Sequence, residues 1–176
     1  ADVSYYPSYI ERDAIKAVDE DIPVKDIVAY VYEEFLDNIQ DDFAMREGLL
    51  FVGGFAHPPN ADAVLWFARE IYPLIREKLD IPFYVVGSKV TDEIKALEQP
   101  GNGIVIKGFV SEEELAELYR TSRIVVVPLR YGAGVKGKVI EALYNGAPIV
   151  TTSIGAEGIP SAGDVMMIQD LSLIHI

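Results

Sequence analysis

Short apolar runs rich in β-forming residues alternate with longer helical patterns from Leu49 onward, and this alternation limits the possible folds more than any other feature. Nearly continuous apolar runs are typical of parallel strands buried on both faces. The helical patterns between them are typical of the crossovers that join such strands. The sequence therefore predicts an α/β fold in which a parallel sheet carries helices on both faces. The predicted strands are 49–53, 82–87, 103–108, 123–128, 147–152 and 165–168.

The longest helical pattern covers residues 60–79, where apolar residues recur at helical spacing. We expect Asn60 and Asp62 to cap its first turn, because short polar side chains satisfy free backbone N–H groups there. Pro73 is expected to kink the same helix, since proline has no N–H to donate.

Later helices carry clearer terminal signals. Thr91 and Ser111 each precede an acidic helical stretch and are predicted N-caps, with Glu114 completing a capping box for the second. The helix that begins near Lys136 is expected to end at Asn145-Gly146, a usual C-terminal stop.

The first 45 residues have a different organisation. DVSYY is predicted to be a strand, Ser8 and Glu11 form a capping box that opens a helix, and residues 27–32 (IVAYVY) are predicted to be a second strand. We interpret residues 1–45 as the last β-α-β unit of a preceding domain, followed by a crossover. Residues 46–170 are then the main domain.

The last six residues, 171–176, read LSLIHI and form an apolar tail. They match the translation of a transposon mosaic-end adapter used in sequencing libraries. We therefore interpret them as a cloning- or sequencing-derived tail and expect the natural chain to continue beyond about Asp170, which leaves the sheet truncated at its C-terminus. The alternative is a genuine tail.

Composition excludes several classes of function. A net charge of −13 repels nucleic acid and anionic lipid over most of the surface, so we expect no nucleic-acid partner and at most peripheral membrane contact. No apolar run approaches the ~20 residues that span a bilayer. The absence of cysteine excludes thiolate metal sites and favours a cytoplasmic location, at most peripheral to the inner membrane face. With two histidines and no close carboxylate cluster, we predict no metal.

Basic residues gather where acidic residues are absent. Residues 118–140 contain no Asp or Glu but hold five of the fifteen Lys and Arg residues. A cationic pocket in an acidic protein favours a small anion, although a solvated helix face would give the same composition. These residues are Arg120, Arg123, Arg130, Lys136 and Lys138.

The loop 129–135 leads into the helix that begins near Lys136 and carries Lys138 and Glu141. Free N–H groups in the first turn and the helix dipole favour a phosphate there. Lys138 and Glu141 lie three apart on one helix face, which is a spacing that a surface ion pair also shows. A carboxylate behind an anion site can accept ribose hydroxyls. This pattern predicts a nucleotide site.

Three segments together resemble a known family: FVGGFAHPPNADAVLWFAREIYPLI, VIKGFVSEEELAELYRTSRIVVVPL and PLRYGAGVKGKVIEALYNGAPIVTTSIGAEGI. They are similar, over about 49–170, to the Rossmann-like donor-binding domain of GT-B glycosyltransferases of the family 4 or "group 1" type. The resemblance implies transfer of a sugar from a nucleoside diphosphate sugar, with retention of configuration and without a metal or other cofactor.

The resemblance also assigns roles to residues. The donor phosphates would be met by Gly53, Gly54, Arg130 and Lys138 and by the backbone of Gly134, Val135, Lys136 and Gly137. Glu141 would hold the ribose, and the base would be flanked by Lys107, Gly108, Phe109 and Val110. Many relatives carry a sugar-contacting glutamate where this chain has Ala133. His57 is a candidate catalytic base, although a histidine in a loop more often serves as a hydrogen-bonding residue.

These observations predict a glycosyltransferase fragment that binds a UDP or GDP sugar for hexosyl transfer to a glycan or lipid-linked acceptor. The acceptor-side domain would lie mostly outside this sequence, so we expect no turnover by the fragment alone. Two alternatives remain open: a nucleotide-sugar epimerase of the same architecture, and a non-catalytic nucleotide-binding module.

Overall fold

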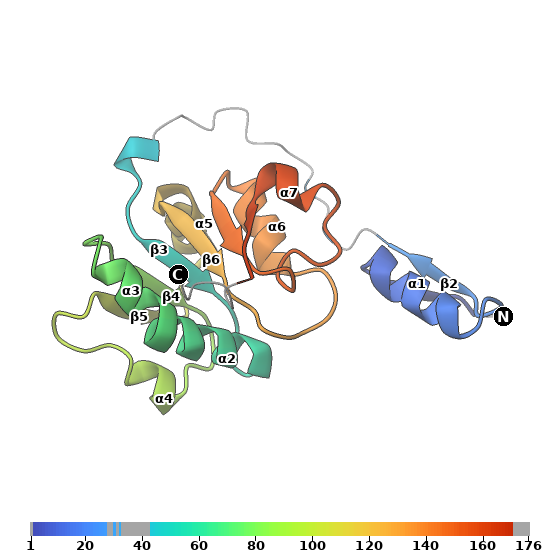
Figure 1. The fold of residues 1–176 in the computed structure, drawn as a ribbon, viewed down its shortest axis with the longest axis horizontal. Coiled ribbons are helices and arrows are strands. Elements are labelled where there is room, and N and C mark those ends of the chain that lie inside the picture. The colour runs from blue at the N-terminus through green and yellow to red at the C-terminus, as the bar shows by residue number, and fades with distance from the viewer. Residues whose placement is uncertain (1, 28–29, 31, 33–42, 171–176) are drawn as a thin grey trace.

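The computed structural model describes residues 2–27, 30, 32 and 43–170. Within these residues the chain forms a two-stranded sheet near the N-terminus and a six-stranded sheet with the order β5-β4-β3-β6-β7-β8. Every strand pair in both sheets is parallel. Helices lie on both faces of the larger sheet (Figure 1). The predicted α/β fold is confirmed.

The strands of the large sheet form where the sequence has its apolar runs. Side chains of β3 and β4 are almost fully buried, with Leu50, Phe51, Phe83 and Val85 at 0% exposure. Such burial on both sheet faces explains why these runs are apolar throughout. The strands are β3 (Leu49–Val52), β4 (Phe83–Val86), β5 (Ile104–Gly108), β6 (Ile124–Val127), β7 (Ile149–Thr151) and β8 (Met167–Ile168).

The helices divide between the two faces of this sheet (Figure 1). One face carries α2 (Pro58–Trp66), a π-helical segment η2 (Phe67–Ile71), α3 (Tyr72–Arg76) and α4 (Asp92–Lys95), which connect β3, β4 and β5. The opposite face carries α5 (Glu112–Thr121) and α6 (Gly137–Tyr144), and α7 (Ala162–Val165) precedes β8. A short 3-10 turn, η1 (Phe43–Met45), precedes β3.

The helix expected at 60–79 starts earlier and is interrupted. It begins at Pro58, with His57 in the N-cap position. Proline is favoured at the first helical position because its missing N–H has no partner to lose. Asn60 and Asp62 therefore lie inside the helix, and their predicted capping role is wrong.

The predicted distortion at Pro73 takes the form of a π turn. In η2 the Tyr72 N–H bonds to the Phe67 carbonyl, five residues back. Because Pro73 donates no hydrogen bond, the helix can widen just before it at little cost.

The predicted caps of α4 and α5 are confirmed: Thr91 accepts from the Ile94 N–H at 3.3 Å and Ser111 from the Glu114 N–H at 3.2 Å.

The N-terminal unit consists of β1 (Ser4–Tyr6), α1 (Tyr9–Val18) and β2 (Val24–Asp26). Ser8 caps α1 by accepting from the Ile10 N–H at 3.2 Å. The second strand was expected at 27–32, but β2 pairs with β1 earlier, at Val24–Asp26, and the described residues 27, 30 and 32 are not in a strand. Residues 28–29 and 31 of that expected strand, like the tail 171–176, lie outside the described residues.

The strand order of the large sheet has a switch point between β3 and β6. From β3 the chain moves outward to β4 and β5, and from β6 it moves outward in the other direction to β7 and β8. The loops that follow β3 and β6 therefore diverge at the carboxyl ends of two adjacent strands. In open α/β sheets, ligands bind in the crevice that such a divergence leaves.

Candidate functional site

Two loops and one helix start meet at this divergence, where a crevice is expected between β3 and β6. The loop after β3 contains Gly53, Gly54 and His57 and leads into α2, and the loop after β6 leads into α6 at Gly137. These are the segments to which the sequence assigned a phosphate site. The side chains that converge here come from α2, α6 and the β6–α6 loop.

Lys138 lies at the centre of the arrangement. Its Nζ donates to Asn60 Oδ1 at 2.6 Å and lies 4.6 Å from the centroid of the Phe51 ring. Burial, opposed by the charge of Glu141, lowers the pKa of Lys138 to about 7. No carboxylate lies within ion-pairing distance of this ammonium group among the described residues. A desolvated ammonium held only by neutral groups is costly, and an anion bound beside it would offset that cost.

Asn60 is a site residue that the sequence did not reveal. Only 8% of it is exposed. Its Nδ2 donates to the Gly54 carbonyl at 2.9 Å while its Oδ1 accepts from Lys138. Asn60 therefore joins the glycine loop to the lysine of α6. The signal available in the sequence was an amide directly after a double proline. Such an amide cannot act as a cap once proline starts the helix.

Gly53 is required by this close packing. A Cβ atom at Gly53 would lie 2.8 Å from Lys138 Nζ and 2.9 Å from Asn60 Cγ. A Cβ at Gly54 would meet only Ser88 Oγ, at 3.4 Å. The first glycine makes room for the lysine, and the second leaves the loop backbone exposed toward the crevice.

Glu141 lies one turn behind Lys138 on α6 and is half-buried. Its Oε2 accepts from the Tyr119 hydroxyl at 3.2 Å. Burial and the charge of Glu141 both raise the pKa of Tyr119, which keeps this phenol a hydrogen-bond donor. A carboxylate has further acceptor capacity, so Glu141 can still receive hydroxyl groups from a ligand.

Arg130, like Lys138, contacts α2, but Arg130 does so through Asp62. Its Nε donates to Asp62 Oδ2 at 2.8 Å, a second hydrogen bond joins its Nη2 to Asp62 Oδ1, and its guanidinium lies 5.3 Å from the Trp66 ring centroid. The bonds to Asp62 raise the pKa of Arg130 further. Arg130 and Lys138 thus converge on α2, although the charge of Arg130 is already paired.

The rest of the cationic run divides between the two ends of the sheet. Arg123 immediately precedes β6 and lies 4.8 Å from the Phe43 ring, while Arg120 pairs with Glu117 on α5. Both lie at the end of β6 opposite to Arg130, because the strand runs between them. The predicted single pocket therefore includes Arg130, Lys136 and Lys138 only.

The helix start that the sequence predicted to bind phosphate is that of α6, which begins at Gly137. Lys136 is the N-cap residue, and its side chain makes no capping hydrogen bond to the first turn. The Lys136 ammonium bonds to Glu157 at 3.2 Å and to the Gly134 carbonyl. A Cβ at Gly137 would lie 2.8 Å from the Tyr30 hydroxyl, so the crossover segment approaches this helix start.

The loop proposed to flank a nucleobase follows β5. Lys107 pairs with Glu114 at 3.5 Å, Phe109 is 81% exposed and Val110 packs against the core. β5 stands three strands from β6, a separation of ~14 Å at the usual strand spacing. A ligand that meets both loops must therefore be extended. His57 is exposed at the start of α2.

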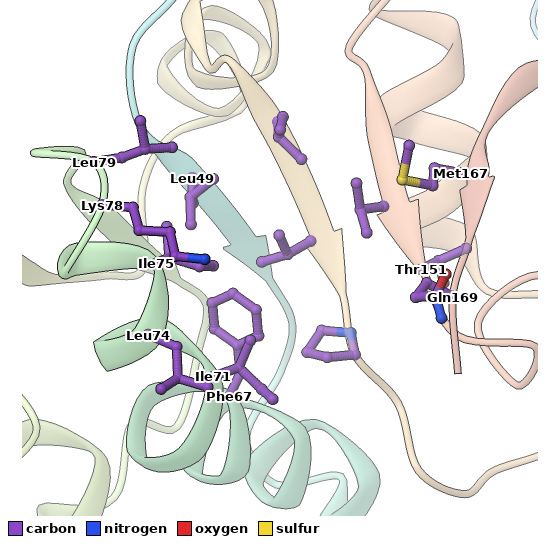
Figure 2. Close-up of a pocket in the computed structure, with 14 residues that line it drawn as sticks. Leu49, Phe67, Ile71, Leu74, Ile75, Lys78, Leu79, Thr151, Met167 and Gln169 are labelled. Atoms are coloured by element: carbon purple, nitrogen blue, oxygen red, sulfur yellow. The ribbon is translucent and has the colours of Figure 1, made fainter. Parts of the chain in front are cut away.

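An apolar groove lies elsewhere in the described chain (Figure 2). It has a volume of about 410 Å³ and lies on the sheet face that carries α2 and α3. Phe67, Ile71 and Ile75 line one side, and Met167 and Gln169 lie across from them. Lys78 is its only cation. This groove does not suit a diphosphate, and the crevice between β3 and β6 remains the candidate site.

The described residues hold neither a metal-binding cluster nor a membrane-spanning helix. They contain no group of three or more His, Asp or Glu side chains that could hold a metal ion. No helix among them has the length and apolarity needed to cross a bilayer.

Comparisons with known proteins identify the family and the fold. Residues 46–170 match the family model described as glycosyl transferases group 1. A Klebsiella pneumoniae protein named "Uncharacterized 44.6 kDa protein in cps region" is 34% identical over 116 residues, which cover 62% of this chain and 30% of that protein. The chain therefore spans about a third of the length of this relative.

Solved structures share the fold at low sequence identity. The crystal structure of TarM matches with a TM-score of 0.72 and 13% identity, covering 96% of this chain and 33% of TarM. Anabaena HepE, solved in complex with UDP and glucose, matches with a TM-score of 0.59 and 17% identity, covering 89% of this chain and 46% of HepE. The six-stranded sheet is that of GT-B glycosyltransferases, and the chain belongs to the group 1 glycosyltransferase family.

Proposed function

We propose that the crevice between β3 and β6 binds the diphosphate of a nucleotide sugar and that the protein transfers a hexosyl group from it to a glycan or lipid-linked acceptor. The observation that carries this proposal is Lys138, whose ammonium group is desolvated beside Gly53 and forms no ion pair with a carboxylate of the described residues. A bound diphosphate would supply the missing negative charge. The first turn of α6 would donate further hydrogen bonds.

The other site residues fit the length of such a ligand. Glu141, behind Lys138 on α6, would accept ribose hydroxyls, and the loop at Lys107–Val110 would meet the base at the far end of the ligand. Arg130 would add positive charge near the sugar-phosphate bond once it exchanges its hydrogen bonds with Asp62 for hydrogen bonds with the phosphate. During transfer, negative charge grows on the departing nucleoside diphosphate, and preorganised N–H groups and cations stabilise it. HepE, which shares the fold, was solved with UDP and glucose.

No metal or other cofactor is needed in this proposal, because Lys138 and the start of α6 supply the positive charge. We propose retention of configuration and assign His57 as a candidate base beside the glycine loop. Residues 1–45 would belong to the acceptor-side domain, which would complete the acceptor site. We therefore expect the 176-residue chain to bind nucleotide without transferring sugar. Transfer by this purified chain would contradict that expectation.

Titration calorimetry with UDP, GDP and ADP tests the proposed site. Lys138→Ala should weaken binding of the preferred nucleotide at least tenfold, and Glu141→Ala should weaken it several-fold, since hydrogen bonds to charged groups contribute about 1.5–3 kcal/mol. Lys95→Ala and Glu117→Ala are matched controls, because both side chains form exposed ion pairs away from the crevice. Equal affinity in all four variants, or no binding of any nucleotide, would refute the proposal.

A further inference from the structure

Glu11 of α1 lies against the glycine loop that precedes α6. A Cβ atom built on Gly134 would stand 3.4 Å from Glu11 Oε2 and 3.8 Å from Oε1. Gly134 is buried and has a φ of +77°, which glycine adopts readily. A side chain from the N-terminal unit therefore occupies the space beside a loop more than a hundred residues later in the sequence. Figure 1 shows the two segments next to each other.

A second contact holds α1 in this position. A Cβ at Gly158, in the loop after β7, would lie 2.9 Å from Ser8 Oγ. Ser8 caps α1 and is only 1% exposed. Two glycines thus let the first turn of α1 approach the carboxyl end of the large sheet. The Glu11 carboxylate is positioned by this packing and not by a polar partner of its own.

The Oε2 atom of Glu11 is buried without a hydrogen-bond partner among the described residues. Nearby cations bond elsewhere: Lys136 bonds to Glu157 and Gly134, and Arg12 bonds to Asp13 and Asp26. A buried acceptor without a partner is costly and uncommon in native proteins. Because Oε2 has almost no accessible surface, a ligand that donates a hydrogen bond to this carboxylate would have to reach Oε1 or displace the packing around Oε2.

The charge of the site limits what that ligand group can be. A carboxylate accepts hydrogen bonds and repels phosphate, so the diphosphate must lie on the Lys138 side of the loop. Ala133, the residue before Gly134, has no polar side chain, so residue 133 cannot meet a polar ligand group with a side chain. Hydroxyl groups attached to the diphosphate would reach toward Glu11.

We propose that Glu11 is the carboxylate that binds hydroxyl groups of the donor sugar, from the N-terminal unit and across the Gly134 loop. This inference rests on the proposed nucleotide site, because it needs the diphosphate to be held by Lys138 and α6. It assigns sugar selection to a side chain outside the Rossmann-like domain.

The test compares nucleotides with and without a sugar on the same protein. Calorimetric dissociation constants are measured for UDP, UDP-glucose and UDP-N-acetylglucosamine, and for GDP and GDP-mannose, with the wild type, Glu11→Gln and Glu11→Ala. Glu20→Gln is the matched control, since Glu20 is exposed after the end of α1. Thermal unfolding of each variant shows that it is folded, and Glu11→Gln preserves the shape of the side chain if Glu11→Ala does not fold.

The wild type should bind one nucleotide sugar more tightly than its nucleoside diphosphate. Both Glu11 variants should lose that advantage, weakening nucleotide-sugar binding roughly tenfold and leaving the nucleoside diphosphate within twofold. An unchanged preference for the sugar form in both variants overturns the role of Glu11 but leaves the nucleotide site intact. The role of Glu11 is also overturned if the wild type shows no preference for a nucleotide sugar, or if removing the carboxylate raises the affinity for UDP or GDP. Absence of all nucleotide binding overturns both proposals.

Discussion

At the scale of single residues, Lys138 combines a structural cost with a proposed use. Its ammonium group packs against Phe51 and bonds to Asn60, and burial has lowered its pKa to about 7. Close to neutral pH the free protein therefore holds this proton only in part. A bound anion favours the charged form and would raise the pKa again. Proton uptake should then accompany nucleotide binding.

This coupling predicts how affinity depends on pH. Below about pH 7 Lys138 is already protonated, so this group adds no pH dependence. Above pH 7 the complex binds a proton that the free protein lacks, and affinity should fall by up to about tenfold per pH unit. Calorimetry of UDP or GDP binding between pH 6 and 9 measures this. Lys138→Arg stays charged and should remove the slope; an equal slope in both proteins would exclude Lys138 as its source.

The two adjacent glycines provide a matched pair of substitutions. Gly53→Ala introduces a Cβ that overlaps Lys138 Nζ and Asn60, whereas Gly54→Ala meets only Ser88 at ordinary contact distance. We expect Gly53→Ala to lower the free energy of unfolding by about 1–3 kcal/mol and Gly54→Ala to leave it nearly unchanged. Urea denaturation of both variants checks this. Equal effects of the two substitutions would show that Lys138 does not pack as described.

At the scale of elements, the strands of the large sheet could be predicted because each is an apolar run. Burial by the fold accounts for the apolar character of β3, β4, β6 and β7, whereas both residues of β8 are exposed. The strand expected at 27–32 shows the limit of this reasoning. Its residues favour β structure, yet the strand forms at Val24–Asp26, where β1 offers a parallel partner. Propensity does not choose between neighbouring segments when pairing decides.

Capping side chains predicted where a helix starts, except where proline gave a stronger signal. Thr91 and Ser111 cap as expected, but Pro58 moved the start of α2 ahead of Asn60. Proline fixes the backbone dihedral φ, whereas a cap contributes one hydrogen bond, so proline dominates. The π turn before Pro73 arises from the same missing N–H.

The cap of α5 gives an element-scale prediction. Ser111→Ala leaves the Glu114 N–H without its acceptor and should lower the free energy of unfolding by about 1 kcal/mol. Ser111→Thr keeps a hydroxyl at the N-cap and should restore most of this loss. Chemical denaturation of both variants measures the difference. If the alanine variant were as stable as the wild type, the cap would contribute nothing.

At the scale of the whole molecule, the site is assembled from segments that the sequence does not connect. Asn60 reaches Lys138, and Glu11 reaches Gly134, only because strand order and helix packing bring them together. The glycine loop, Lys138 and Glu141 could be assigned from local pattern, since a phosphate-binding helix start has a local signature. The two partners from other elements could not, because a single sequence carries no record of contacts between distant residues.

The central claim is that the crevice between β3 and β6 holds a diphosphate, and a crystal structure of the chain with UDP or GDP, whichever binds more tightly, tests it most directly. We predict that the diphosphate lies within hydrogen-bonding distance of Lys138 Nζ and the first N–H groups of α6, with the ribose hydroxyls at Glu141. A nucleotide bound elsewhere, such as in the groove of Figure 2, with Lys138 still bonded only to Asn60, would contradict the claim.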